Sequence, residues 1–216
     1  MIDEQAPRMG ERAWRLWAAV IALTAWSGLV LQAFEVFWRV HSWAVTLWRL
    51  ALFFTIFSNL TVAITFSAIA LGVRRLRHPF VLAGLAMTMA LVGTVFELML
   101  RRTLHLAGGR LVSNALLHDA VPLLTIGAWF VLAEKGRLRL RDPWLIALFP
   151  IVYLGYALIR GATGGFYPYP FIDPVRIGWI GVLGYVVAIT AVFLLFGYGV
   201  VRLDRWLATK ANARHS

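Results

Sequence analysis

The chain has 216 residues, of which 61% are hydrophobic and 14% are charged, and its formal net charge is +11. A mean hydropathy of +0.76 excludes a water-soluble globular domain, because such a domain needs far more polar surface. The basic residues are dispersed along the chain at the ends of apolar segments, a membrane pattern that argues against a nucleic-acid partner.

Six apolar segments reach or approach the roughly 20 residues that a membrane-spanning helix needs. In chain order, we predict helices at about 14–36, 47–71, 79–100, 112–133, 143–160 and 176–201. The fifth is the shortest and contains Pro150. The connections leave no room for a soluble domain, so we expect one all-α membrane domain over residues 1–216, a bundle of six transmembrane helices. The first segment is too long for a signal peptide and is expected to remain as an anchor.

The distribution of lysine and arginine predicts the orientation. If the N-terminus is cytoplasmic, most of the 21 basic residues, including those at the two ends of the chain such as Arg8 and Arg214, fall on the cytoplasmic side. The outer side then holds the rest: Arg39, Arg49, Arg101, Arg102, Arg110, Arg160 and Arg176. Because excess positive charge marks the cytoplasmic side, both termini are expected to be cytoplasmic. Arginine greatly outnumbers lysine, which favours a bacterial chain and therefore its cytoplasmic (inner) membrane.

A polar cluster at 54–59 interrupts the second predicted helix. Polar side chains at bilayer depth are costly and are functional-site hypotheses by default. Thr55 lies three residues before Ser58 and four before Asn59, so the three share one face of a helix. With the helix beginning near residue 47, Thr55 is expected about 12 Å from its outer end.

A second polar cluster, at 114–122, interrupts the fourth predicted helix. Asn114 and His118 are four residues apart and share a face. Pro122 follows His118 by four residues and has no backbone N–H, so we expect a kink and a freed His118 carbonyl. The imidazole is expected about 9 Å from the outer end of this helix. A hydroxyl on one helix and an imidazole on another are the minimum parts of nucleophilic ester chemistry.

Other polar features fall at the same outer level. They are Glu35, Glu97, and a loop at 164–174 that contains Tyr167, Tyr169, Phe171 and Asp173. The prolines and glycines of this loop indicate a fixed shape, so we expect a lid over a site between the helices.

Structural roles are alternatives for each of these residues. Serine, threonine and asparagine commonly join membrane helices by hydrogen bonds, and Glu97 can pair with Arg101 one turn further on. Asp119 can likewise pair with an arginine at the outer rim. Glu97, His118 and Asp119 match no metal-binding motif, so we predict no metal and no cofactor. The remaining histidines are interpreted as solvated: His41, His78, His105 and His215. The chain has no cysteine, which excludes a thiolate nucleophile and cysteine-ligated metals.

Three elements together resemble the androgen-induced-gene family of six-helix membrane proteins. They are the threonine cluster at 54–59, the Asn114-x-x-x-His118 element followed by Pro122, and the Tyr167-Pro-Tyr-Pro-Phe171 loop. The chain is similar to bacterial members of that family. Its vertebrate members include intramembrane threonine hydrolases that cleave fatty acid esters of hydroxy fatty acids (FAHFA). The resemblance places the catalytic threonine at Thr55 and the catalytic histidine at His118. The vertebrate pattern has a second histidine where Ala115 stands here.

The resulting hypothesis is an intramembrane hydrolase of lipid esters, with Thr55 as nucleophile and His118 as base near the outer leaflet. Ser58, Asn59 and Asn114 are candidates to orient the imidazole or to bind the oxyanion, and Glu97 or Asp173 to act as a third catalytic member. The expected partner is a membrane lipid or fatty acid ester. The alternatives are a non-catalytic lipid-binding or scaffolding protein and, third, a small permease. The sequence sets neither the acyl chain length nor the oligomeric state.

Overall fold

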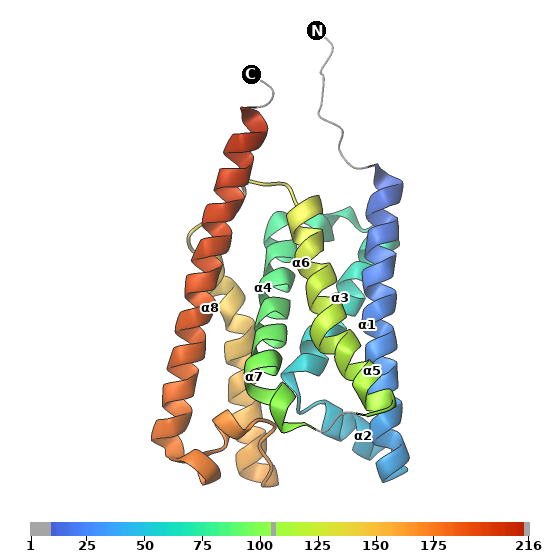
Figure 1. Ribbon diagram of the computed structural model, residues 1–216, viewed down its shortest axis with the longest axis vertical. Helices are drawn as coiled ribbons and strands as arrows, with labels where there is room; N and C mark the ends of the chain where they lie inside the picture. Colours follow the sequence, from blue (N-terminus) through green and yellow to red (C-terminus); the bar gives the residue numbers. More distant parts are fainter. Residues whose placement is uncertain (1–9, 105–106, 214–216) are drawn as a thin grey trace.

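The structure is a computed structural model that describes residues 10–104 and 107–213. Every regular element in these two stretches is a helix, and the helices pack into one bundle (Figure 1). Four residues interpreted above lie outside the described residues: Arg8, His105, Arg214 and His215.

Five helical spans in the described residues are long and apolar enough to cross a membrane. Three of them consist of one helix each: α1 (Glu11–Val40), α7 (Asp142–Gly164) and α8 (Pro174–Asn212). The second in chain order begins with α4 (Pro79–Val95) and continues through a π-helical turn, Phe96–Leu100, and a short 3-10 turn, Arg101–Thr103. The third joins α5 (Gly109–Ala115), a second π-helical turn, Leu116–Ala120, and α6 (Val121–Leu132). The chain is therefore an integral membrane protein built as a helical bundle, as the sequence predicts.

The second predicted helix is the exception. It is broken into α2 (Trp43–Leu50) and α3 (Phe54–Ala70), which meet at an angle of 96° and supply a sixth span only if they are counted together. The prediction of one continuous helix at 47–71 is wrong. Thr55 consequently lies in the first turn of α3, not eight residues inside a helix.

Side chains of α7 stabilise this break. A helix end leaves backbone carbonyls without intrahelical partners, and in an apolar surrounding each needs another donor. The Tyr156 hydroxyl donates to the Ala51 carbonyl at 2.7 Å, and the Tyr153 hydroxyl donates to the Leu52 carbonyl at 2.6 Å. Arg160, one turn further along α7, donates to a third carbonyl near the end of α2. Since none of these donors is local to residues 47–71, the break cannot be seen in that segment alone.

The core lies between α1, α3, α4 and α6, with α1 packed along α3 and α4 packed along α6. Its largest fully buried apolar side chains are those of Ile21, Val62, Phe66, Ile69, Leu82, Met87, Met89 and Val121. Helix α8 lies at the periphery, against α7 and α4 (Figure 1). Its path changes direction near its start because Gly178 has a φ of 69°, a left-handed conformation that favours glycine.

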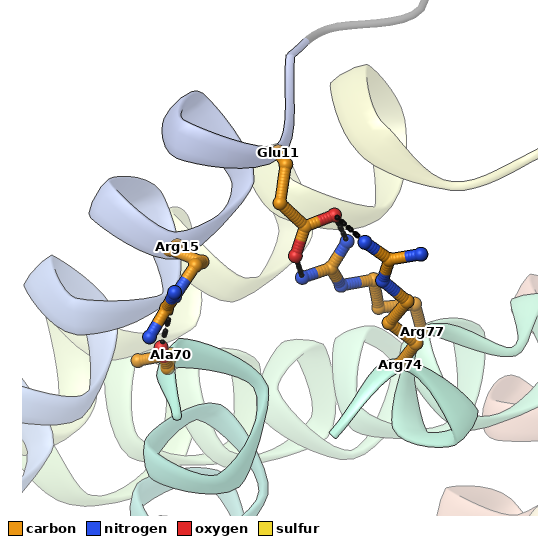
Figure 2. Close-up of polar contacts among 5 residues, drawn as sticks. All are labelled: Glu11, Arg15, Ala70, Arg74 and Arg77. Atoms are coloured by element: carbon orange, nitrogen blue, oxygen red, sulfur yellow. Dashed lines mark hydrogen bonds and ion pairs between the residues drawn. The ribbon is translucent and has the colours of Figure 1, made fainter. Parts of the chain in front are cut away.

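Helix α1 begins and α8 ends at the same end of the bundle (Figure 1). Figure 2 shows how the first turn of α1 is joined there to the connection between α3 and α4. The Glu11 carboxylate accepts two hydrogen bonds from Arg77, at 2.7 and 2.9 Å, and also pairs with Arg74. Arg15 donates from Nε to the Ala70 carbonyl at the end of α3. We call this end of the molecule the terminal end.

A buried carboxylate makes a second junction at the terminal end. Asp204 of α8 is fully buried and accepts hydrogen bonds from the backbone N–H groups of Gly136 and Leu138, at 2.9 and 3.0 Å. Lys135 lies beside it, donates to the Trp129 carbonyl and covers the Trp129 ring. Burial lowers the pKa of Lys135, which lies outside the spans. Asp204 thus ties α8 to the connection between α6 and α7.

Candidate active site

At the opposite end of the bundle, the expected contact between the two polar clusters is present. The Thr55 hydroxyl oxygen lies 3.2 Å from Nε2 of His118. Thr55 comes from the first turn of α3, and His118 from the π-helical turn between α5 and α6. A hydroxyl and an imidazole at this distance are within reach of proton transfer.

The second ring nitrogen indicates which tautomer a neutral imidazole adopts. Nδ1 of His118 lies 3.2 Å from the backbone carbonyl of Asn114. A carbonyl oxygen only accepts hydrogen bonds, so we assign the proton of the neutral ring to Nδ1. Nε2 then carries a free lone pair, and the Thr55 hydroxyl donates to it. Asn114 orients the imidazole through its main chain, whereas its side chain donates to the Arg110 carbonyl and does not reach the ring.

The π-helical turn around His118 replaces the expected simple kink. Pro122 has no N–H to offer the His118 carbonyl. On the neighbouring helix, Gly93 faces this carbonyl so closely that a Cβ there would lie 3.2 Å from the oxygen. The Phe96 ring stacks on the imidazole, with centroids 3.9 Å apart and planes inclined by 21°. The imidazole is therefore held between a ring on one side and its own main chain on the other.

Asn59 joins the two halves of the site. Its amide is fully buried and donates to the carbonyl of Thr55 at 2.9 Å and to the carbonyl of Leu117 at 3.2 Å. These bonds hold the first turn of α3 against the π-helical turn that carries His118. Asn59 is thus a positioning residue that acts through these two carbonyls, and its role in orienting the imidazole or binding the oxyanion stays a prediction.

Three other sequence candidates are not part of this arrangement. Glu97 is ion-paired with Arg101, which also binds Asp119 at 2.5 Å, so the local pairing expected as the alternative is confirmed. Asp173 caps α8 by accepting from the Val175 N–H and has no hydrogen bond to Thr55 or His118 in the structure, so its role as a third catalytic member stays a prediction. Ser58 is buried, but its hydroxyl has no hydrogen-bond partner among the described residues and does not contact His118.

Of the loop residues, Tyr169 lies closest to the reacting pair. Its side chain is buried, and its hydroxyl accepts from the Phe54 N–H at the start of α3, at 3.0 Å. The hydroxyl groups of Thr55 and Tyr153 are its further neighbours. Burial raises the pKa of Tyr169, which lies in the connection between α7 and α8, so the phenol stays protonated at neutral pH. It is therefore available as a hydrogen-bond donor.

The rest of the loop closes this end of the bundle. Phe171 stacks on Tyr169, with centroids 5.2 Å apart and planes inclined by 5°. The Tyr167 ring packs on Gly161 of α7, where a Cβ would come within 2.2 Å of the ring. Tyr167 thus anchors the loop to α7, while Tyr169 and Phe171 face the interior.

Two adjoining cavities meet at the Thr55–His118 pair. The smaller, of about 120 Å³, lies between α4, α7 and α8 and is lined almost entirely by apolar side chains such as Val92, Ile151 and Phe193. The larger, of about 940 Å³, is lined partly by polar and basic side chains from α1, α2, α5 and α7. The residues common to both are Thr55, Phe96, Leu100, His118 and Tyr169. A molecule bound at Thr55 can therefore extend into two cavities, one apolar and one partly polar.

Sequence reasoning missed two parts of this site: the hydroxyl of Tyr153 beside Tyr169 and the basic lining of the larger cavity. A signal for the first is present, since Tyr153, Tyr156 and Arg160 recur at helical spacing on one face of α7. Within residues 10–104 and 107–213, no three His, Asp or Glu side chains are grouped so as to hold a metal ion.

Comparison with known proteins gives no match to a family model, to a curated protein or to a solved structure. The likeness to the androgen-induced-gene family accordingly stays a prediction. Any functional conclusion rests on the geometry of the site.

Proposed function

We propose that the protein is an intramembrane hydrolase of lipid esters, of the kind that cleave fatty acid esters of hydroxy fatty acids. The proposal places it in a bacterial inner membrane with both termini cytoplasmic, so that lipid reaches the site from the outer leaflet. The observation that carries it is the 3.2 Å contact between the Thr55 hydroxyl and Nε2 of His118, at the junction of two cavities.

In this mechanism the Thr55 oxygen attacks the ester carbonyl while Nε2 of His118 takes the hydroxyl proton. The carbon–oxygen bond to the alcohol then breaks, and the alcohol leaves with the proton held by His118. Water, activated by the same nitrogen, cleaves the acyl-threonine and releases the fatty acid. The Asn114 carbonyl, which accepts from Nδ1, stabilises the imidazolium that forms in each step.

The negative oxygen of the tetrahedral intermediate needs a hydrogen-bond donor. Tyr169 is the best candidate, because its phenol is buried beside Thr55 and remains protonated. Its oxygen already accepts from the Phe54 N–H, which strengthens the phenol as a donor. Removal of one such donor typically lowers kcat by about 10²–10³-fold.

A fluorophosphonate probe tests the proposal without a known substrate. An activated threonine displaces fluoride from phosphorus and keeps the phosphonyl group, which peptide mass spectrometry locates. We expect labelling at Thr55 of the purified, folded protein, and loss of the label in Thr55→Ala and His118→Ala. Thr61→Ala is a matched control, since Thr61 lies on the same helix, is exposed and bonds its own helix at the Phe57 carbonyl.

The result that would contradict the proposal is equally direct. If wild type stays unlabelled, or if Thr55→Ala is labelled as strongly as wild type, the hydroxyl is not activated. The contact between Thr55 and His118 would then be an interhelical hydrogen bond, and the protein a lipid-binding or scaffolding one.

A further inference from the structure

Four arginine side chains line the larger cavity, and each comes from a different helix. They are Arg39 of α1, Arg49 of α2, Arg110 of α5 and Arg160 of α7. The described lining of this cavity contains no aspartate or glutamate. Arg39 and Arg49 are exposed and Arg110 and Arg160 are half-buried, so water screens their mutual repulsion, and an anion among them would be attracted by all four.

The protein itself neutralises only part of this charge. Arg39 pairs with Glu35 at 3.5 Å, and Arg160 is held by the Trp48 carbonyl and the Tyr156 hydroxyl. The guanidinium groups of Arg49 and Arg110 have no hydrogen-bond or ion-pair partner among the residues that the structure describes. Three cationic groups in one cavity, Arg49, Arg110 and Arg160, therefore lack a protein carboxylate.

The number of cations selects the chemistry of the anion. A carboxylate carries one negative charge and two oxygens, enough for one guanidinium fork. A phosphate monoester carries about −1.5 to −2 charges at neutral pH and three terminal oxygens, which suit several arginines arriving from different directions. The cavity volume of about 940 Å³ also exceeds what a carboxylate alone needs.

The larger cavity adjoins the Thr55–His118 pair, so an anion bound in it can be part of the ester that reacts there. Thr55 and His118 line both cavities, so an ester carbonyl at the pair has the basic cavity on one side and the apolar cavity on the other. The acyl chain of an ester suits the apolar side, between α4, α7 and α8. The alcohol part of the same ester then lies among the arginines.

We infer that the substrate is an acyl ester of a phosphorylated alcohol, whose phosphate binds between Arg49, Arg110 and Arg160. This inference rests on the proposed ester hydrolysis by Thr55 and His118, and it replaces the hydroxy fatty acid ester by a phosphorylated one as the preferred substrate. Attack by Thr55 breaks the acyl carbon–oxygen bond, and the phosphorylated alcohol leaves with the proton from His118. Water then releases the fatty acid, so one ester and one water give one acid and one alcohol.

The test compares three esters of one acyl chain length with purified full-length protein in detergent micelles. They are a monoacylglycerol phosphate, the corresponding monoacylglycerol, and the acyl ester of a hydroxy fatty acid. We expect kcat/KM to be at least about tenfold higher for the phosphorylated ester than for either of the others. In Arg49→Gln and Arg110→Gln, the ratio of kcat/KM for the phosphorylated ester to that for the neutral ester should fall about tenfold. Arg176→Gln, an exposed arginine outside the cavity lining, is the matched control and should keep the wild-type ratio.

A binding experiment distinguishes failure of this inference from failure of the proposed function. An ether-linked alkylglycerol phosphate cannot be hydrolysed, so its binding reports on the phosphate site even if the protein cleaves no ester. We expect wild type to bind it more tightly than the uncharged alkylglycerol, and Arg110→Gln to lose that preference. Inorganic phosphate at millimolar concentration should compete only weakly, because it lacks the chain.

Four outcomes overturn the inference. Three of them are a preference for the neutral or the carboxylate ester, an unchanged ratio in both arginine variants of confirmed melting temperature, and equal binding of the two ether lipids. Competition by inorganic phosphate as strong as that by the ether-linked phosphate would also overturn it, because the cavity would then be a site for the free anion.

Discussion

The two ends of the bundle use charged side chains in opposite ways. At the terminal end each carboxylate is engaged by the protein: Glu11 binds two arginines, and Asp204 binds two backbone N–H groups. At the other end, arginines line a cavity without a carboxylate among its described lining residues, and a hydroxyl faces an imidazole. Only this second end has a broken helix and two π-helical turns.

This difference distinguishes charged groups that hold segments of the protein together from charged groups that can bind a ligand. A charge that is bound by groups of the protein itself stabilises a junction between its segments. Charges and hydroxyls left facing a cavity, held there by helix interruptions, can act on something that is not protein. Substitutions at the terminal end should therefore change stability, and substitutions at the other end should change chemistry.

The largest expected effect is at the reacting pair. Thr55→Ala and His118→Ala should each lower ester cleavage by at least about 10³-fold, because each removes a member of a unit that acts together. Hydrolysis by purified protein measures this, with yield and melting temperature as checks of folding. A variant that keeps full activity would falsify the mechanism.

Next comes the proposed oxyanion donor. Tyr169→Phe keeps the stacking on Phe171 but removes the hydroxyl, so kcat should fall about 10²-fold. KM should stay nearly constant, because the bond to the oxyanion forms only in the transition state. If KM rises while kcat is unchanged, Tyr169 contributes to ground-state binding and not to the chemistry.

At the terminal end, Asp204→Ala should destabilise the protein and spare the chemistry. Two N–H groups lose their acceptor, and that of Leu138 is buried, so the free energy of unfolding should fall by about 2 kcal/mol and the melting temperature by roughly 5 °C. Asp204→Asn is the matched variant, since its amide oxygen can still accept both bonds, and it should lose less. A fall in kcat of the folded Asp204→Ala protein would contradict the claim that substitutions at the terminal end change stability alone.

The smallest effect is expected for Glu11→Gln, because the ion pairs of this exposed carboxylate are largely screened by solvent. The melting temperature should change by about 2 °C or less, and the difference should vanish at about 1 M salt. A larger loss that persists at high salt would mean that the junction in Figure 2 acts through packing rather than charge.

Hydropathy was enough to predict the class of fold and the approximate position of the long spans. It could not predict the break at 51–53, because Ala51, Leu52 and Phe53 are as apolar as their neighbours. The break depends on Tyr153 and Tyr156, a hundred residues away in sequence, which bind the carbonyls that it frees. Long-range capping of this kind leaves no trace in a local hydropathy pattern.

Within the site, the contact of Thr55 with His118 followed from the resemblance and from matching depth in the predicted bundle. The supporting residues were predicted less well. Glu97 and Asp173 each had a partner close in sequence, Arg101 four residues on and the Val175 N–H two residues on, and these local contacts prevailed. Asn59 does support the site, but through two main-chain carbonyls that no side-chain pattern records.

The π-helical turn at Leu116–Ala120 has a consequence for how this protein can vary. Each such turn accommodates one residue more than an α-helix of the same path. Deleting a single residue after His118 would restore regular winding without moving Val121–Leu132 from its path, so the change would fall on the turn itself and on the direction of the imidazole. The spacing between the histidine and the helix that follows is consequently encoded in chain length, so a one-residue gap there would be more damaging than most substitutions.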